Sequence, residues 1–228
     1  ICYYVMDYYP NGTLEDEITK NGLMSEEDAI RRVMRPLARA VKTMHDNGWL
    51  HLDIKVENVL MDEEGLAVLG DLGISQQYDN DGNKITKGGG LGSSGACRWQ
   101  FDEVFTSQFH PELDIYSLAA MYYLILTGNM DHRHFNPSDL DEYDNISDES
   151  KNAIIAALHP DLETTPKDIV EFMRMLPGCA DLELPVLLPE EVEDDEDFEL
   201  DDFDFDDLEL PVFDTEDLPT ASGSGSTY

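Results

Sequence analysis

The chain has 228 residues, a length that fits one or two domains, and its 50 acidic and 14 basic side chains give a formal net charge of −36 at pH 7. Residues 1–180 hold 31 acidic and all 14 basic side chains, whereas residues 181–228 hold 19 acidic and no basic ones. Because nucleic-acid phosphates are bound by Lys and Arg, this charge argues against nucleic acid as a direct partner. The acidic last segment is expected to lie outside the globule.

The cysteines and the apolar runs bear on location. Cys2, Cys97 and Cys179 are odd in number and widely spaced, which excludes a disulfide framework and a CxxC zinc site and favours a reducing compartment. The longest apolar run, Leu118–Leu126, is far shorter than the roughly 20 residues that cross a bilayer, and the start carries no signal pattern. The sequence predicts an intracellular protein without a membrane partner, in the cytoplasm or, as the alternative, the nucleus.

The first 50 residues predict a strand, a turn and a helix. Residues 1–6 are apolar and aromatic, as in a strand, and Pro10-Asn11-Gly12 is strong turn chemistry. Ser25 followed by Asp28 is a capping box. Apolar residues then recur at three- and four-residue intervals, namely Ile30, Val33, Met34, Leu37, Val41 and Met44. This pattern predicts an amphipathic helix that ends at Asn47-Gly48, with a kink at Pro36 because proline removes one backbone donor.

The most informative stretch is residues 51–60, HLDIKVENVL, followed by DLG at residues 71–73. Mg²⁺ takes oxygen ligands and needs only one or two protein carboxylates beside the phosphates of a nucleotide. Asn58 and Asp71 supply such oxygens, and Lys55 supplies a positive charge for a phosphate oxygen. Residues 66–69 between the two loops have the apolar character of a short buried strand. The pattern therefore indicates a site for a nucleotide and magnesium.

These two loops resemble the catalytic loop, H-R-D-L-x-x-x-N, and the magnesium loop, D-F-G, of eukaryotic-type protein kinases. His51, Asp53 and Asn58 match the first motif at its spacing, and Asp71 and Gly73 match the second. The lysine two residues after the aspartate resembles the serine/threonine form of the loop. The resemblance spans roughly residues 1–178 and implies an α+β, protein-kinase-like fold, mainly the α-helical C-terminal lobe with the N-terminal lobe largely missing.

The resemblance implies a function for the matching residues, namely transfer of the γ-phosphate of ATP to serine or threonine of protein substrates. Asp53 would be the catalytic base and Lys55 would steady the γ-phosphate. Asn58 and Asp71 would hold Mg²⁺, so that ATP and Mg²⁺ are the expected cofactors. Basic protein substrates are favoured because the chain is acidic.

Further residues would bind the nucleotide if the resemblance holds. Met6 resembles the gatekeeper, Asp7 and Tyr9 resemble the hinge residues whose backbone reads adenine, and Thr13 would lie near the ribose. Leu60 would form the apolar floor under adenine. The alternative for the hinge is that these are ordinary strand and turn residues.

The core of the lobe and its helices can also be predicted. His51 and Leu72 would stack as the lower part of the apolar spine, which is compatible with His51 being a hydrogen-bonded core histidine. Asp114 resembles the aspartate of D-x-W-S-L-G that braces the catalytic loop, and the alternative is a simple helix N-cap. Residues 118–126 predict a helix buried on nearly all faces. Helices are also expected over 148–158 and 166–176, with Pro166 at a helix start.

The stretch between the magnesium loop and this central helix contains a glycine-rich run, residues 88–95. A phosphate cradle is the alternative reading, but the Lys-Ser/Thr of a P-loop is missing, which favours a flexible activation segment. Gly95, Trp99 and Glu103 resemble G-T-x-x-Y-x-A-P-E. Phe101-Asp102 replaces Ala-Pro, and no arginine near residues 163–165 matches the usual partner of Glu103.

Several departures from the family pattern bear on activity. The chain has no Gly-rich loop, V-A-I-K lysine or helix glutamate before the hinge, so a fragment that is inactive alone is expected. Leu52 replaces the catalytic-loop arginine, which predicts activity independent of activation-loop phosphorylation. These departures leave a pseudokinase scaffold as the alternative to an active kinase.

The expected domains are a partial kinase domain over residues 1–180 and an acidic tail over residues 181–228. In the tail, acids alternate with Phe and Leu, a composition that cannot bury enough apolar surface to fold alone and predicts disorder. A solvated tail is one reading. The other is a segment that docks on a basic protein or on the lobe, which makes an interaction protein the third functional hypothesis.

Overall fold

The computed structural model describes residues 6–79, 110–130, 135–158 and 165–184. The chain divides into two units, Ile1–Leu188 and Pro189–Tyr228, and the described residues all belong to the first. The predictions for the first strand, for the glycine-rich run with Gly95, Trp99 and Glu103, and for most of the acidic tail therefore lie outside the described residues.

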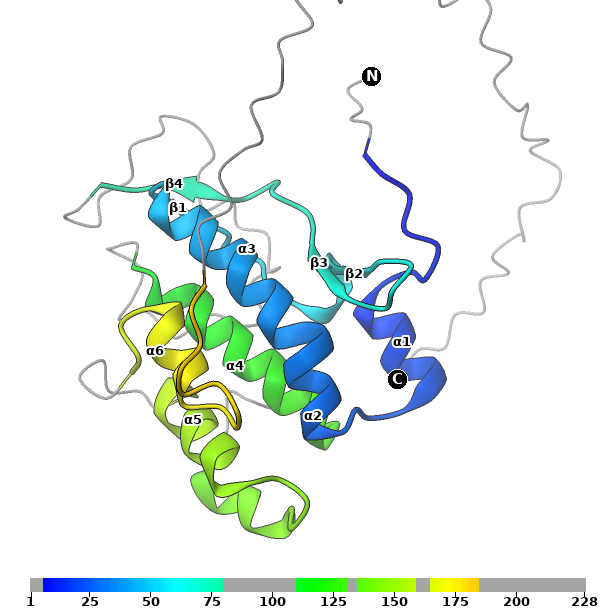
Figure 1. Ribbon diagram of the computed structural model, residues 1–228, viewed down its shortest axis with the longest axis vertical. Helices are drawn as coiled ribbons and strands as arrows, with labels where there is room; N and C mark the ends of the chain where they lie inside the picture. Colours follow the sequence, from blue (N-terminus) through cyan, green and yellow to red (C-terminus); the bar gives the residue numbers. More distant parts are fainter. Residues whose placement is uncertain (1–5, 80–109, 131–134, 159–164, 185–228) are drawn as a thin grey trace, which may run out of the picture. The chain divides into compact units, whose positions relative to one another are not determined.

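The described part is rich in helices and contains two small antiparallel sheets (Figure 1). The helices are α1 Leu14–Asn21, α2 Glu26–Asp28, the π-helix η1 Ala29–Met34, α3 Arg35–Asp46, the 3₁₀ helices η2 Val56–Asn58 and η5 Pro137–Glu142, α4 Glu112–Thr127, α5 Asp148–Leu158 and α6 Ile169–Arg174. The strands are β1 Trp49–Leu50, β2 Val59–Met61, β3 Ala67–Leu69 and β4 Gln76–Gln77. β1 pairs with β4, and β2 pairs with β3.

The helix predicted before the catalytic loop is confirmed at both ends. Ser25 is the N-cap of α2, and its Oγ accepts a hydrogen bond from the N–H of Asp28 at 3.2 Å. α3 ends at Asp46, and Gly48 at φ +72° closes the helix, because its N–H donates to the carbonyl of His45 at 2.9 Å. Between these ends the backbone is π-helical over Ala29–Met34. This irregularity ends just before Pro36, which lacks the N–H that a regular α-helix would use there.

α4 is the centre of the core, as its sequence predicts. Every residue from Asp114 to Leu126 is buried, so the helix has no solvent-facing side over most of its length. It packs against α5 and against η1, and the hydroxyl of Tyr122 lies 2.8 Å from the hydroxyl of Ser150 on α5. α3 in turn packs against α6, β1 and β3, which places α3 beside both small sheets. Within the described residues, no helix combines the length and apolarity needed to cross a membrane.

Two predictions about local structure need correction. The last helix begins at Ile169 and not at Pro166, because the side chain of Asp168 caps it by accepting the N–H of Glu171 at 2.8 Å. Pro166 lies two residues before this cap. Strand β3 forms as expected, but only Ala67 within it is buried. A sheet of two strands leaves the remaining residues partly exposed.

Candidate catalytic site

The loop that follows β1 is held by Asp114, a buried residue in the first turn of α4. Its Oδ2 accepts the backbone N–H of His51 at 2.8 Å, and its Oδ1 accepts that of Leu52 at 2.8 Å. Nε2 of His45, in the last turn of α3, lies 2.9 Å from the same Oδ2. The predicted bracing of the loop is confirmed. The alternative of a helix N-cap is wrong, because Pro111 occupies that position and makes no side-chain cap bond.

The charge on Asp114 is stabilised in spite of its burial. Burial raises the pKa of this carboxyl, but hydrogen bonds from His45 and from the N–H groups of Leu52 and His51 outweigh it, so the pKa lies below its usual value. Leu52 adopts φ +67°, a left-handed conformation that is unfavourable for leucine. The charged carboxylate thus holds a strained backbone in place.

His51 joins the two loops through its ring. It is fully buried, and its Nε2 lies 2.9 Å from the carbonyl of Gly70, just before the magnesium loop. Because a carbonyl only accepts, Nε2 carries the proton, and Nδ1 is left to accept the N–H of Asp53 at 3.3 Å. His51 is therefore a satisfied core histidine that also fixes the distance between the loops.

Three of the predicted site residues meet at one carboxylate. Asp53 is 8% exposed, and its Oδ2 accepts hydrogen bonds from Nζ of Lys55 at 3.0 Å and Nδ2 of Asn58 at 2.7 Å. Nδ2 of Asn58 also donates to the Asp53 carbonyl at 2.9 Å, which fixes the orientation of the amide. The other carboxylate oxygen, Oδ1, is buried and has no partner among the described residues. It is an acceptor in place for a hydroxyl group.

Asn58 and Asp71 lie at the same end of the β2–β3 hairpin. Asn58 directly precedes β2 and Asp71 follows β3 by two residues, and the strands are antiparallel with Val59 opposite Leu69. The N–H of Gly70 donates to the carbonyl of Asn58 at 2.9 Å, which closes this end. Asp71 itself is exposed, at φ +57°, and its Oδ1 accepts the N–H of Gly73 at 3.0 Å.

The donor set of this end fits magnesium. Nδ2 of Asn58 is committed to Asp53, so the amide oxygen remains available as a ligand, and the exposed carboxylate of Asp71 adds a second hard oxygen. Over the described ranges, no group of three or more His, Cys, Asp or Glu side chains could hold a metal ion. Magnesium does not require such a group, because phosphates and waters complete its shell.

The predicted stacking of Leu72 on His51 is wrong. Leu72 is 61% exposed, whereas His51 is buried. The left-handed backbone at Asp71 precedes Leu72, whose side chain lines an open, largely apolar cavity of about 510 Å³ with Met44 and Trp49. Thr43, Asn47 and Ser75 complete the lining.

The predicted nucleotide-binding residues are only partly brought together. The turn before α1 is confirmed, because the N–H of Gly12 donates to the carbonyl of Tyr9 at 3.1 Å and Gly12 has φ +73°. Met6 and Asp7 lie before this turn and are exposed, while Tyr9 is half-buried. The hinge role of Met6, Asp7 and Tyr9 stays a prediction.

Thr13 and Leu60, by contrast, are neighbours. They form an antiparallel β-bridge, and the N–H of Met61 donates to the carbonyl of Gly12 at 2.9 Å. The side chain of Thr13 caps α1 by exchanging hydrogen bonds with Asp16, including one from the N–H of Asp16 at 3.1 Å. The start of α1 is thus tied to the strand that follows the catalytic loop.

One residue of the site is missing from the sequence predictions. His45 bonds Asp114 across 69 positions of the chain and is 8% exposed at the side chain. In the sequence, His45 is marked only by its position. It lies in the last helical turn before the catalytic loop, on the side of the helix where the apolar residues face the core.

Comparison with known proteins agrees with this geometry. The family model for the protein kinase domain matches residues 1–179. A probable myosin light chain kinase of Dictyostelium discoideum is 35% identical over 133 residues, 56% of this chain and 25% of that protein. A putative sperm motility kinase W of Mus musculus is 30% identical over 176 residues, which cover 72% of this chain and 34% of that protein. The serine/threonine protein kinase OSK3 of Oryza sativa subsp. indica is 28% identical over 176 residues, 76% and 32%.

The match to the family model covers well over half of the chain, and the chain spans only a quarter to a third of the length of these relatives. The helix-rich lobe and its two small sheets agree with the mainly α-helical fold that the sequence predicts. The chain belongs to the protein kinase domain family.

Proposed function

We propose that the full-length protein containing this chain transfers the γ-phosphate of ATP to serine or threonine side chains of protein substrates, with residues 1–180 as its partial kinase domain. The observation that carries the proposal is the arrangement at Asp53, where one oxygen holds Lys55 and Asn58 and the other is buried and unpaired. Serine/threonine preference is supported by Lys55 two residues after Asp53 and by the name of the rice relative, a serine/threonine protein kinase.

The chemistry follows from what each side chain can do where it lies. Oδ1 of Asp53 accepts the hydrogen bond of a substrate hydroxyl and so orients the hydroxyl oxygen for attack. The same Oδ1 receives the proton of that hydroxyl. Nζ of Lys55 lies 3.0 Å from the other oxygen and would place a positive charge beside the transferred group. When bound, ATP would supply the phosphoryl group, and its magnesium would neutralise part of the phosphate charge. Asn58 and Asp71 would hold the magnesium through their oxygens.

We assign the nucleotide base to the surface formed by β2 and the turn before α1. Leu60 would be the floor under adenine, with Thr13 next to it through the β-bridge and Met6, Asp7 and Tyr9 leading into it. A Cβ on Gly70 would come within 3.3 Å of the Asn58 carbonyl and 3.4 Å of Cδ1 of Leu60. The absence of a side chain at Gly70 therefore supports close packing of the magnesium loop against this floor.

The proposal is tested by measuring transfer from Mg-ATP to basic peptides that differ only in having serine, threonine or tyrosine as acceptor. Transfer to serine or threonine is expected, and Asp53→Asn should lower the rate by at least ~100-fold because the base is lost. Glu63→Gln, an exposed charge removal in the β2–β3 turn, is the matched control and should leave the rate unchanged. Undiminished transfer by a folded Asp53→Asn protein would contradict the roles assigned here.

A pseudokinase scaffold is the second candidate, favoured by Leu52 in place of arginine and by the outward Leu72. It predicts a folded protein that transfers no phosphate to any of the three peptides. A third proposal concerns residues 181–228, whose charge suits a basic protein partner inside the cell. Binding to a basic protein that weakens strongly with salt and survives deletion of residues 1–180 would support this tail as the working part.

A further inference from the structure

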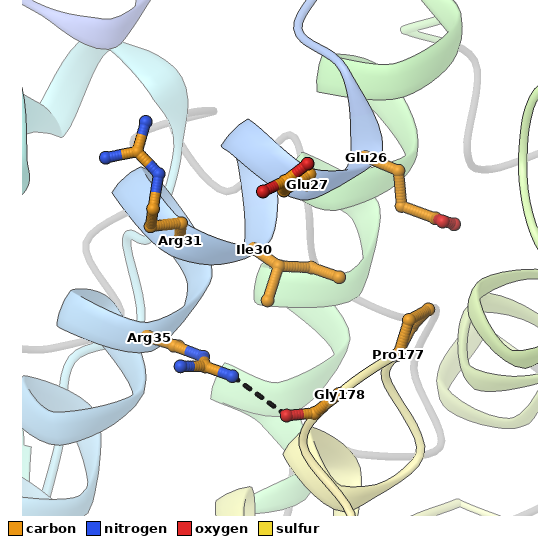
Figure 2. Close-up of a pocket in the computed structure, with 7 residues that line it drawn as sticks. All are labelled: Glu26, Glu27, Ile30, Arg31, Arg35, Pro177 and Gly178. Atoms are coloured by element: carbon orange, nitrogen blue, oxygen red, sulfur yellow. Dashed lines mark hydrogen bonds between the residues drawn. The ribbon is translucent and has the colours of Figure 1, made fainter.

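A groove of about 380 Å³ lies at the N-terminal end of α3, away from the catalytic loop. Its lining consists of Glu26, Glu27, Ile30, Arg31, Arg35, Pro177 and Gly178 (Figure 2). The catalytic loop follows the opposite end of α3, whose 12 residues span roughly 18 Å at 1.5 Å per residue. The groove is thus a separate feature of the lobe, built from the start of one helix and the segment after α6.

Arg35 forms the basic end of the groove. Its Nη2 donates to the carbonyl of Gly178 at 2.9 Å, the bond drawn in Figure 2, and lies 3.6 Å from Sγ of Cys179. Its Nε is buried and has no hydrogen-bond partner, and no carboxylate of the described residues pairs with its charge. Nη1 makes no hydrogen bond within the described residues, so its donors are left for an incoming acceptor. Because Nε is enclosed, a ligand in the groove meets only the accessible part of the half-buried guanidinium.

The other end of the groove is acidic. Oε1 of Glu26 accepts hydrogen bonds from the N–H of Ser147 at 3.0 Å and from its hydroxyl at 2.8 Å, so this side chain is fixed in place. Glu27 is exposed and makes no ion pair within the described residues. The cation of the same turn, Arg31, is already paired with Asp28 at 2.6 Å. The charge of Glu27 is therefore available to a ligand.

The space between the two ends is apolar. Figure 2 shows Ile30 and Pro177 between the glutamates on one side and Arg35 with Gly178 on the other. The groove thus has one end with Glu26, Glu27 and the Asp28-paired Arg31, an apolar middle, and Arg35 at the other end. Its volume falls in the range of sites that enclose a small ligand or a few side chains.

We propose that this groove docks a peptide segment of a protein partner, with a large apolar side chain between Ile30 and Pro177. A lysine or arginine of the segment pairs with Glu27, and an aspartate or glutamate on the other side of the apolar residue pairs with Arg35. Charge complementarity at both ends selects this pattern over uniformly acidic or basic segments. The site binds a partner without using the catalytic loop, so its test does not depend on phosphoryl transfer.

The test is selection of random dodecapeptides displayed on phage against the immobilised full chain. The enriched peptides are expected to carry a cation and an anion on either side of a large apolar residue. By fluorescence anisotropy, Glu27→Lys should weaken the best peptide about fivefold or more, and exchange of the peptide's cation for glutamate should restore its affinity to that variant. Arg35→Gln should also weaken binding. Arg39→Gln removes an exposed charge one turn along α3, outside the groove, and should have no effect.

Glu27 is exposed, so its variant should fold even if Arg35→Gln does not. Enriched peptides that lack the pattern, an affinity unchanged by Glu27→Lys, or no enrichment at all would each overturn the proposal.

Discussion

The catalytic loop and the magnesium loop match their motifs equally well in the sequence, but the structure holds them in very different ways. In the catalytic loop, His51, Leu52 and Asp53 are all buried and bonded through Asp114 or through each other. In the magnesium loop, residues 71–73 are all exposed.

This difference separates two kinds of site residue. A general base must be positioned before the substrate arrives, and a buried carboxylate provides that positioning from the core. A magnesium ligand acts together with phosphates and water, so the loop of Asp71, under the role proposed for it, would gain its remaining contacts only when they are present. The catalytic loop should therefore be a stability element of the lobe, whereas the magnesium loop should contribute little to folding.

The largest expected effect follows from breaking the support of the catalytic loop. Asp114→Asn removes a buried charge that accepts three hydrogen bonds, and it turns a donor toward donors. It should lower the free energy of unfolding by about 4 kcal/mol, measured by urea denaturation. Glu112→Gln, two residues earlier in the same helix, should change it by less than ~0.5 kcal/mol. A loss below ~1 kcal/mol for Asp114→Asn would show that the loop is held by other contacts.

A matched pair of truncations compares the two loops by packing alone. Ile54 lies in the catalytic loop and is fully buried, so Ile54→Ala should cost about 3 kcal/mol. Leu72→Ala in the magnesium loop should cost less than ~0.5 kcal/mol, because Leu72 is already mostly exposed. Equal losses in urea unfolding would mean that Leu72 packs in the folded protein.

Acid should act on the catalytic loop through Asp114. Its pKa is lower in the folded than in the unfolded protein, so its stabilising contribution is complete above the usual carboxyl pKa of about 3.8 and is lost as the pH falls toward the folded value. In that range, this group alone should remove at most about 1.4 kcal/mol of unfolding free energy per pH unit. The Asp114→Asn protein should lack this part of the acid dependence, and identical pH slopes in both proteins would argue against it.

Much of the catalytic loop was predictable because its signals are local. The spacing of His51, Asp53 and Asn58, the Ser25 cap and the stop at Asn47-Gly48 depend on neighbours within a few positions. The burial of α4 was likewise predictable from its composition, since its residues are apolar on nearly all faces.

The remaining features depend on contacts that the order of residues does not specify. The orientation of Leu72 follows from the left-handed backbone at Asp71, a conformation that no side-chain pattern indicated there. The bond between His45 and Asp114 joins two helices that are far apart in the sequence. At α6, both Pro166 and Asp168 could mark the start of the helix. Asp168 determines the start, because its side chain accepts the otherwise free N–H of Glu171.

The most direct test of the division between the loops is calorimetric titration of ATP into the full-length protein containing this chain, with and without magnesium, for wild type, Asp53→Asn and Asp71→Asn. If Asp71 holds the metal and Asp53 serves the hydroxyl, Asp71→Asn should lose at least about tenfold of the magnesium-dependent gain in ATP affinity, while Asp53→Asn keeps it. Asp71→Asn should unfold at nearly the wild-type urea midpoint, whereas Asp53→Asn should unfold at a lower one, because its buried carboxylate accepts from Lys55 and Asn58. Equal magnesium dependence in all three proteins would contradict the metal role of Asp71 and the account built on it.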